Sequence, residues 1–253
     1  GLPTGIQFEA ACLGFSGGPA DKDALIVELF KINRRLVTHD ALIALSGAHA
    51  GQPGVITIAG TGSISFGRSA AGKVDRVGGW GYVFGDEGGG FDLTRQALRA
   101  ALRMEEGWGP DTVLRALLLE ATGATNSNEL LHKFYTPDFP RPRIAALSQL
   151  VVQAASQGDH VAGDILNEAA QQLAGITTAA RTQVFTRDEV APVAYVGGVF
   201  KSERLLDEFR SRVERGGRAK VSPPRFNPAA GALLEAYRLA GLSPELSNVP
   251  TEK

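Results

Sequence analysis

Three groups of residues in this 253-residue chain have the types and the spacing that a catalytic or binding site requires. The first is the turn Gly60-Thr61-Gly62-Ser63, which follows the β-branched run 55–58. A tight turn between two strands brings backbone N–H groups up to an anion, and glycine removes the Cβ that would keep a ligand away. The same turn is common in ordinary β-hairpins, so alone it leaves both interpretations open. The chain has no GxxxxGK[ST] sequence and no GxGxxG after a strand, which excludes the P-loop and Rossmann types of phosphate site.

The second group is the glycine-rich stretch 78–90, GGWGYVFGDEGGG. Glycine loses extra entropy on ordering, so this composition would be a costly way to build a plain loop. Trp80 fits either a core anchor or an apolar wall for a sugar ring. For the adjacent carboxylates of Asp86 and Glu87, one interpretation has one of them facing a ligand or Mg²⁺ while the other caps the helix expected from Phe91. The other interpretation has both as helix N-terminal acids.

The third group lies at predicted strand ends. His39-Asp40 closes a short apolar strand, where carboxylates in α/β sheets meet ligands. Asp40 therefore fits a general base for a sugar hydroxyl, or a turn or helix cap, and His39 favours a packing role. Gly197-Gly198 stands between a strand and a helix, which suits a phosphate or planar group at the helix entrance as well as a plain tight turn.

The elements that must position these groups follow two patterns. The N-terminal part alternates strand, turn, helix, strand, acid and helix, which predicts a parallel α/β lobe. Its expected elements are strand 7–15, a turn at Ser16-Gly17-Gly18-Pro19, helix 24–31, strand 35–38 and helix 41–50. The rest predicts a hairpin after strand 55–58, then helices, then a return to strands. Its expected elements are helices 91–104, 112–121, 126–134, 144–157 and 161–185, an irregular loop 136–143, a cap at Asp159, strands 192–196 and 219–221, and helices 203–214 and 229–240.

Composition narrows the class of protein. Lys and Arg number 26 against 27 Asp and Glu, so no overall field favours nucleic acid or an anionic membrane. Cys12 is the only cysteine, which excludes an intramolecular disulfide framework, a CxxC zinc site and a self-contained iron–sulfur cluster. No apolar run approaches 18 residues. We expect a cytoplasmic protein that binds neither nucleic acid nor membrane and offers no metal ligands of its own.

Five ordered motifs resemble the BadF/BadG/BcrA/BcrD-type ATPase family, and within it the N-acetylglucosamine kinase branch. They are LGFSGG (13–18), THDALIAL (38–45), AGTGSI (59–64), GGWGYVFGDEGGG (78–90) and YVGGVFKS (195–202). The resemblance implies the α/β actin/hexokinase/Hsp70-like fold, with two ribonuclease-H-like lobes and ATP in the cleft between them.

The resemblance also implies roles for individual residues. Asp40 matches the catalytic aspartate that accepts the proton of the sugar hydroxyl. The sugar-binding residues implied are Ser16, Asp40, Thr61, Gly62, Trp80, Gly81 and Asp86. The nucleotide-binding residues implied are Gly60, Thr61, Gly62, Ser63, Gly197, Gly198 and Ser202. The reaction implied is transfer of the ATP γ-phosphoryl group to an N-acetylglucosamine- or glucosamine-like sugar with Mg²⁺, and we expect a homodimer.

One departure concerns the family's first phosphate loop. That loop is a D-G-G-G-T-type sequence after an opening strand, and no such stretch occurs here. Either the sequence is a fragment, which its start at Gly1 favours, or this copy cannot cradle the β- and γ-phosphates normally. We expect residues 1–50 to be the remainder of an N-terminal lobe, with the tail 242–253 as a candidate addition. Residues 51–241 would form the C-terminal lobe with helical insertions.

Two other functions stay open. The first is an ATPase activator of a radical dehydratase or reductase, a branch of the same family that uses cysteines to bridge a cluster between subunits. The position of Cys12 inside an apolar strand argues against it. The second is a non-catalytic sugar-binding or regulatory module, which the missing phosphate loop makes plausible. The chain also lacks the Cys-rich finger of repressor-related, zinc-dependent sugar kinases.

Overall fold

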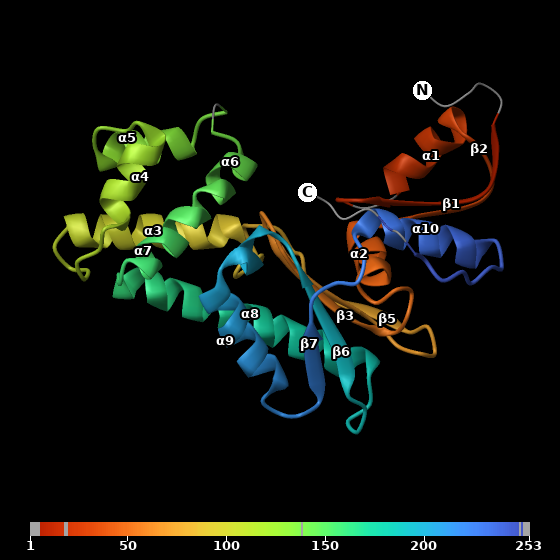
Figure 1. Cartoon of the computed structure of the whole chain (residues 1–253). Helices are drawn as coiled ribbons and strands as arrows, with labels where there is room; N and C mark the ends of the chain where they lie inside the picture. The colour runs from red at the N-terminus through yellow and green to blue at the C-terminus, as the bar shows by residue number, and fades with distance from the viewer. Residues whose placement is uncertain (1–5, 18–19, 138, 248, 250–253) are drawn as a thin grey trace.

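The protein contains a pair of N-terminal strands, a larger mixed sheet and a set of helices inserted between strands of that sheet (Figure 1). A computed structural model describes residues 6–17, 20–137, 139–247 and 249. The strands are β1 Gln7–Phe15, β2 Lys31–His39, β3 Gly54–Ala59, β4 Ser63–Arg68, β5 Val74–Gly78, β6 Ala191–Val196 and β7 Ala219–Ser222. The helices are α1 Ala20–Leu29, α2 Asp40–Ala48, α3 Gly90–Glu105, α4 Leu114–Thr122, α5 Ser127–Phe134, α6 Arg141–Ala146, α7 Ser148–Ser156, α8 His160–Val184, the 3₁₀ helix η1 Gly198–Lys201, α9 Glu203–Glu214 and α10 Pro228–Leu239.

The N-terminal strands β1 and β2 are parallel, which confirms the predicted α/β arrangement. Helix α1 begins earlier than predicted, at Ala20. It also ends earlier, because Lys31 already pairs with Gln7 as the first residue of β2. Two residues of the expected turn, Gly18 and Pro19, lie outside the described residues.

The larger sheet has the strand order β5-β4-β3-β6-β7. The hairpin β3–β4 is antiparallel as predicted, whereas β6 and β7 continue the sheet in parallel with β3. Strand β5 is an addition that the sequence pattern did not predict, because VDRVG is short and two of its five residues are charged.

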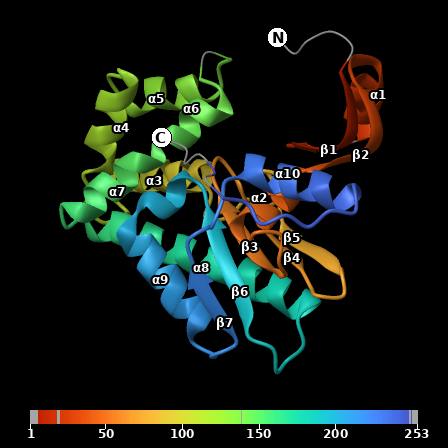
Figure 2. The ribbon, with the colours of Figure 1, turned by 45° about the vertical axis from the view of Figure 1, so that its right-hand side comes forward.

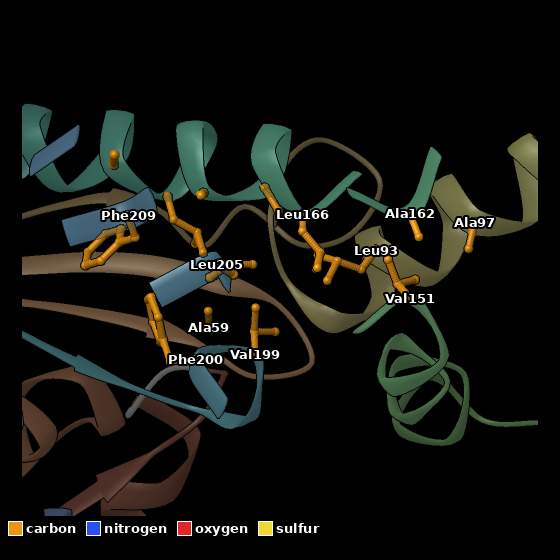
Figure 3. Close-up of a cluster of buried hydrophobic side chains, with 14 of the residues drawn as sticks. Ala59, Leu93, Ala97, Val151, Ala162, Leu166, Val199, Phe200, Leu205 and Phe209 are labelled. Atoms are coloured by element: carbon orange, nitrogen blue, oxygen red, sulfur yellow. The ribbon is translucent and has the colours of Figure 1, made fainter. Parts of the chain in front are cut away.

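Helices cover both faces of this sheet (Figure 2). Adjacent residues of a strand point to opposite faces, and Val55 and Ile56 accordingly enter different cores. Val55 joins the large cluster beneath α8, part of which Figure 3 shows, and Ile56 joins a small cluster beneath α2. Helices therefore pack on both faces of the sheet, and β3 contributes side chains to the core on each face.

The expected loop 136–143 is corrected in its second half, where Arg141 begins helix α6. Pro142 is tolerated in the first turn because a proline there gives up no helical hydrogen bond. The expected helix 144–157 is accordingly divided at Leu147 into α6 and α7. The predicted cap at Asp159 is confirmed, since its Oδ1 accepts a hydrogen bond of 2.9 Å from the amide of Ala162.

Helices α2 and α10 lie between the N-terminal strands and the larger sheet in both views (Figures 1 and 2). Helix α10 contacts α2, β1 and β2. The division at residue 50 stays a prediction, and residues 248 and 250–253 of the tail lie outside the described part. No helix among the described residues combines the length and apolar character needed to cross a bilayer.

Candidate active site

Ser16 and Asp40 follow the carboxyl ends of the two N-terminal strands. The register pairs Phe15 with His39, so the residues immediately after them leave the same edge of the sheet. Asp40 is the first residue of α2, and His39 before it makes no side-chain cap. The Asp40 carboxylate is exposed and accepts no hydrogen bond from the described residues. The helix-cap interpretation of Asp40 therefore finds no support, and its carboxylate is open to a ligand.

The turn 60–63 joins β3 to β4 and is fastened to the start of α3. The carbonyl of Gly60 accepts from the amide of Gly90 at 2.8 Å, and the carbonyl of Thr61 accepts from Phe91 at 3.0 Å. The amides of Thr61 and Gly62 donate to no acceptor within the described part of the chain. Two free N–H groups on a fixed turn are what an anion site needs.

The Ser63 side chain connects the turn to another segment of the chain. Its hydroxyl is buried and donates to the carbonyl of Glu87 at 2.6 Å. This bond ties the turn to the glycine-rich stretch 78–90, so a structural role already accounts for the Ser63 side chain.

Gly197 brings a second glycine turn against the first. Strands β3 and β6 run in parallel, with Ile58 beside Val196 at their ends. Gly197 has φ +118°, and a Cβ there would lie 2.2 Å from the carbonyl oxygen of Ala59, so only glycine allows this approach. A Cβ on Gly198 would meet nothing within 4 Å, so the face of this turn is open.

The family resemblance assigns Ser202, together with this turn, to the nucleotide site. In the structure Ser202 is buried and caps helix α9. Its hydroxyl oxygen accepts from the amide of Leu205 at 3.4 Å. The two glycine turns are thus brought together at one sheet edge, while the Ser202 side chain is already engaged in the helix behind them.

Trp80 lies at the surface, with 67% of its area exposed. The core-anchor interpretation is therefore wrong. The guanidinium of Arg76 stacks on the indole, 4.8 Å from the ring centroid, which holds the ring in place while one face stays open. Gly81 follows with φ +82°, a conformation that glycine adopts without strain.

Asp86 is a buried carboxylate with a left-handed backbone, φ +62°. Its Oδ2 pairs with Nη2 of Arg141 at 3.0 Å, and a Cβ built on Gly62 would lie 2.2 Å from the same oxygen. The carboxylate therefore rests directly on the backbone of the 60–63 turn. The structure brings Asp86 and Gly62 together as expected, although they are 24 positions apart in the sequence.

Neither Asp86 nor Glu87 caps α3. The N-cap is Gly89, which has no side chain for this role, and Asp92 instead accepts from the amide of Gly88 at 3.0 Å. The cap interpretations of these two acids are wrong. Sequence reasoning missed Asp92 and Arg141, because Asp92 lies inside a helical pattern and Arg141 lies beside prolines in what reads as a loop.

Comparison with known proteins identifies one family, and the two curated relatives are both amino-sugar kinases. The model of the BadF/BadG/BcrA/BcrD ATPase family matches residues 5–236. The N-acetylmuramic acid/N-acetylglucosamine kinase of Clostridium acetobutylicum is 32% identical over 91% of this chain and 78% of its own. The N-acetyl-D-glucosamine kinase of Dictyostelium discoideum is also 32% identical, over 91% of this chain and 76% of its own.

The fold has a close counterpart among solved structures. A crystal structure of a candidate N-acetylglucosamine kinase from Chromobacterium violaceum superposes with a TM-score of 0.73 at 29% identity, covering 92% of this chain and 78% of that one. The predicted hexokinase-like α/β fold is confirmed by this likeness and by those to other sugar kinases. On the family match and the two curated relatives, the chain belongs to the BadF/BadG/BcrA/BcrD ATPase family.

Proposed function

We propose that the protein is an ATP-dependent amino-sugar kinase that phosphorylates N-acetylglucosamine or a closely similar sugar. The observation that carries this proposal is the identity of 32% with two curated amino-sugar kinases across 91% of the chain. The family model's match, residues 5–236, includes every site group described above. The geometry supports it with an exposed carboxylate at one strand edge and two open glycine turns at another.

In this mechanism Asp40 is the general base. The sugar hydroxyl oxygen bonds to the γ-phosphorus while its proton passes to the Asp40 carboxylate, and the bond from the γ-phosphorus to the β–γ bridging oxygen breaks to release ADP. The free amides of Thr61 and Gly62 would hold phosphate oxygens, and the turn at Gly197-Gly198 would take the adenosine side. The sugar would lie between Ser16 and the segment that carries Trp80, Gly81 and Asp86.

Mg²⁺ fits this chemistry as an ion that arrives with the nucleotide. It usually keeps several waters and needs only one or two carboxylates besides the substrate phosphates. No group of three or more His, Cys, Asp or Glu suited to a metal occurs among the described residues. When bound, Mg²⁺ would neutralise charge on the transferred phosphoryl group.

The chemistry of Cys12 disfavours the radical-enzyme activator. Burial, together with the negative charge of Glu235, raises the pKa of the Cys12 thiol to about 11. A cluster ligand is a thiolate, and iron would have to remove a proton that this thiol holds more firmly than an exposed cysteine does.

The test is a phosphotransfer assay with the chain in its full natural length. ATP and Mg²⁺ are incubated with N-acetylglucosamine, glucosamine or N-acetylmannosamine, and phosphosugar is measured by mass spectrometry. We expect phosphosugar from at least one of them. Sugar binding without turnover would instead favour the regulatory module, and iron with acid-labile sulfide in a purified dimer would favour the activator. The homodimer itself is checked by sedimentation.

A further inference from the structure

The buried carboxylate of Asp86 pairs with a single cation in the described part of the chain. Its side chain is 7% exposed, its backbone has φ +62°, and its Oδ2 accepts from Nη2 of Arg141 at 3.0 Å. Its other oxygen, Oδ1, accepts no hydrogen bond within the described part of the chain. A buried carboxylate without a partner is strongly unfavourable, so the Arg141 contact is what holds the Asp86 side chain in this position.

Arg141 reaches this site from the helical insertion, at the first residue of α6. Helix α6 is fastened to the start of α3, because the Thr94 hydroxyl donates to the carbonyls of both Gly90 and Ile144, at 3.0 and 2.9 Å. A Cβ on Gly90 would lie 2.9 Å from the carbonyl oxygen of Ala145, which leaves no room for a larger residue. Gly90 in turn donates to the carbonyl of Gly60. The insertion is thus anchored on the glycine turn that it approaches.

Apart from its bond to Asp86, the Arg141 guanidinium makes only a weak contact within the described part of the chain. It lies 5.2 Å from the ring centroid of Tyr82, and its Nε is buried without an acceptor among the described residues. A second arginine, Arg95 of α3, donates to the carbonyl of Tyr82 at 3.1 Å and pairs with Asp92 rather than with Asp86. Asp86 is therefore the sole anionic partner of Arg141 in the described part of the chain.

We propose that Arg141 is a positioning residue for the sugar. It holds Oδ2 of Asp86 against the Gly62 backbone, which leaves Oδ1 to accept a sugar hydroxyl in a charge-assisted hydrogen bond. This proposal rests on the proposed function, since it takes Asp86 to be a sugar ligand. It assigns to the helical insertion a part in substrate binding that none of the expected site residues provides.

The experiment measures kinetics and direct binding in Arg141→Met, Arg141→Lys and Asp86→Asn. Loss of one charge-assisted hydrogen bond predicts that Arg141→Met raises the KM for N-acetylglucosamine by about tenfold or more, with kcat changed less than about threefold and the KM for ATP unchanged. Lysine restores the charge without the planar fork and is expected to recover part of the affinity. Because both residues act on one hydrogen bond, the double variant Asp86→Asn, Arg141→Met is expected to bind no more weakly than the weaker single variant.

The matched control is Arg115→Met, which breaks another arginine–carboxylate pair of the insertion, 2.9 Å from Glu105, and should leave both KM values unchanged. Thermal unfolding of each variant separates positioning from loss of fold. Calorimetric titration with N-acetylglucosamine separates this proposal from the proposed function. A wild type that binds the sugar but transfers no phosphoryl group would overturn the kinase function. The effect of Arg141→Met on sugar affinity would still test the positioning role. Unchanged sugar affinity in a folded Arg141→Met protein, additive effects in the double variant, or no sugar binding by the wild type would each overturn the positioning role.

Discussion

The two sheets of this molecule are built very differently. In the described part of residues 6–40, Ile26 is the single buried side chain, and four large apolar residues near it are 38–61% exposed: Leu25, Val27, Leu29 and Phe30. In the larger sheet, by contrast, β3 is buried along most of its length and enters cores on both faces. The larger sheet is packed well enough to be rigid, whereas the strands β1 and β2 depend on α2 and α10 for their position.

The residues of the candidate site are divided between these two regions. Ser16 and Asp40 directly follow the lightly packed strands β1 and β2, whereas both glycine turns adjoin strand ends of the firmly packed sheet and Asp86 contacts one of those turns. We therefore expect the rigid region to bind ligands and the lighter one to bring the base to them, as in enzymes whose lobes close over substrate. The predictions below test that division of labour.

The largest effect is expected from Asp40→Asn. Asparagine keeps the size of the side chain but cannot accept a proton, so kcat should fall by about 10²–10⁴-fold while the KM for sugar stays nearly constant. The exposed position predicts an unchanged melting temperature. Steady-state kinetics and calorimetric sugar titration measure the two effects.

The control is Asp21→Asn, an exposed acid in the first turn of α1, which should keep full turnover. Wild-type turnover in Asp40→Asn would remove Asp40 as the base and with it the proposed role of the lighter region.

The next effect concerns the junction between the two regions. Glu235 of α10 is buried and pairs with Nη1 of Arg68 in β4 at 2.6 Å, while Ser46 of α2 donates to the same carboxylate. Removing one partner of a buried ion pair is strongly destabilising, so Arg68→Met should lower the free energy of unfolding by about 3 kcal/mol. Urea unfolding at pH 7 is the measurement.

Arg238 provides the comparison, because it pairs with the same carboxylate at 3.1 Å but its side chain is 51% exposed. Arg238→Met should lower the free energy of unfolding by less than about 1 kcal/mol. Equal losses in the two variants would contradict the view that the buried pair holds α10 to the larger sheet.

A smaller effect tests how tightly Asp86 is held. A Cβ on Gly62 would lie 2.2 Å from Oδ2 of Asp86, whereas a Cβ on Gly60 would meet nothing within 4 Å. Gly62→Ala must displace the carboxylate, so we expect a loss of about 1–3 kcal/mol in the free energy of unfolding. Gly60→Ala should change stability by less than about 0.5 kcal/mol.

Denaturant unfolding of the two alanine variants decides the point. Similar stability of both would mean that the turn and the carboxylate can move apart, and the region would then be less rigid than its packing indicates.

The sequence predicted most elements whose pattern is local. Strand 7–15 and helix 203–214 were predicted with the observed bounds, because apolar spacing and the following turn or cap residues agree there. Strand β5 and helix α6 were missed, since β5 is stabilised by pairing with β4 and α6 by packing on α3. Both depend on neighbours distant in the chain, which no local pattern reports.

In the candidate site, too, local patterns were predictable and contacts between distant residues were not. Adjacent strand ends bring Ser16 to Asp40 and Gly60 to Gly197, and the order of elements predicts this. The Ser63 side chain could not be assigned in advance, because its hydroxyl bonds to the carbonyl of Glu87, 24 positions away. Ser202 differs, because its bond to the amide of Leu205 is a local helix cap that the position before helix 203–214 can indicate. The pair between Asp86 and Arg141 spans 55 positions and leaves no signal in the sequence.

The smallest expected effect is a pH dependence of the free energy of unfolding, which arises from His49 where α2 joins the larger sheet. Burial, assisted by the nearby Arg68 charge, lowers the pKa of His49 below its usual value, although the bond from its Nε2 to the Val55 carbonyl opposes this. The unfolded imidazole takes up a proton near pH 6.5, whereas the folded one does so only at lower pH. Below about pH 6.5 the unfolded state therefore binds more protons, and the free energy of unfolding falls as pH falls, by up to about 1.4 kcal/mol per unit of pKa difference.

Unfolding midpoints in urea at pH 7.5, 6.5, 5.5 and 5.0 should show this decline in the wild type and a flatter profile in His49→Gln. The exposed His132 supplies the control, because His132→Gln removes an imidazole with no buried partner and should leave the decline intact. A profile in His49→Gln as steep as the wild type would assign the decline between pH 7.5 and 5.0 to groups other than His49. The Ser46 and Arg68 hydrogen bonds overcome the opposing effect of burial and lower the pKa of Glu235, so its contribution is lost only at more acidic pH. The pH at which stability begins to fall thus distinguishes the imidazole from the carboxylate at the same junction.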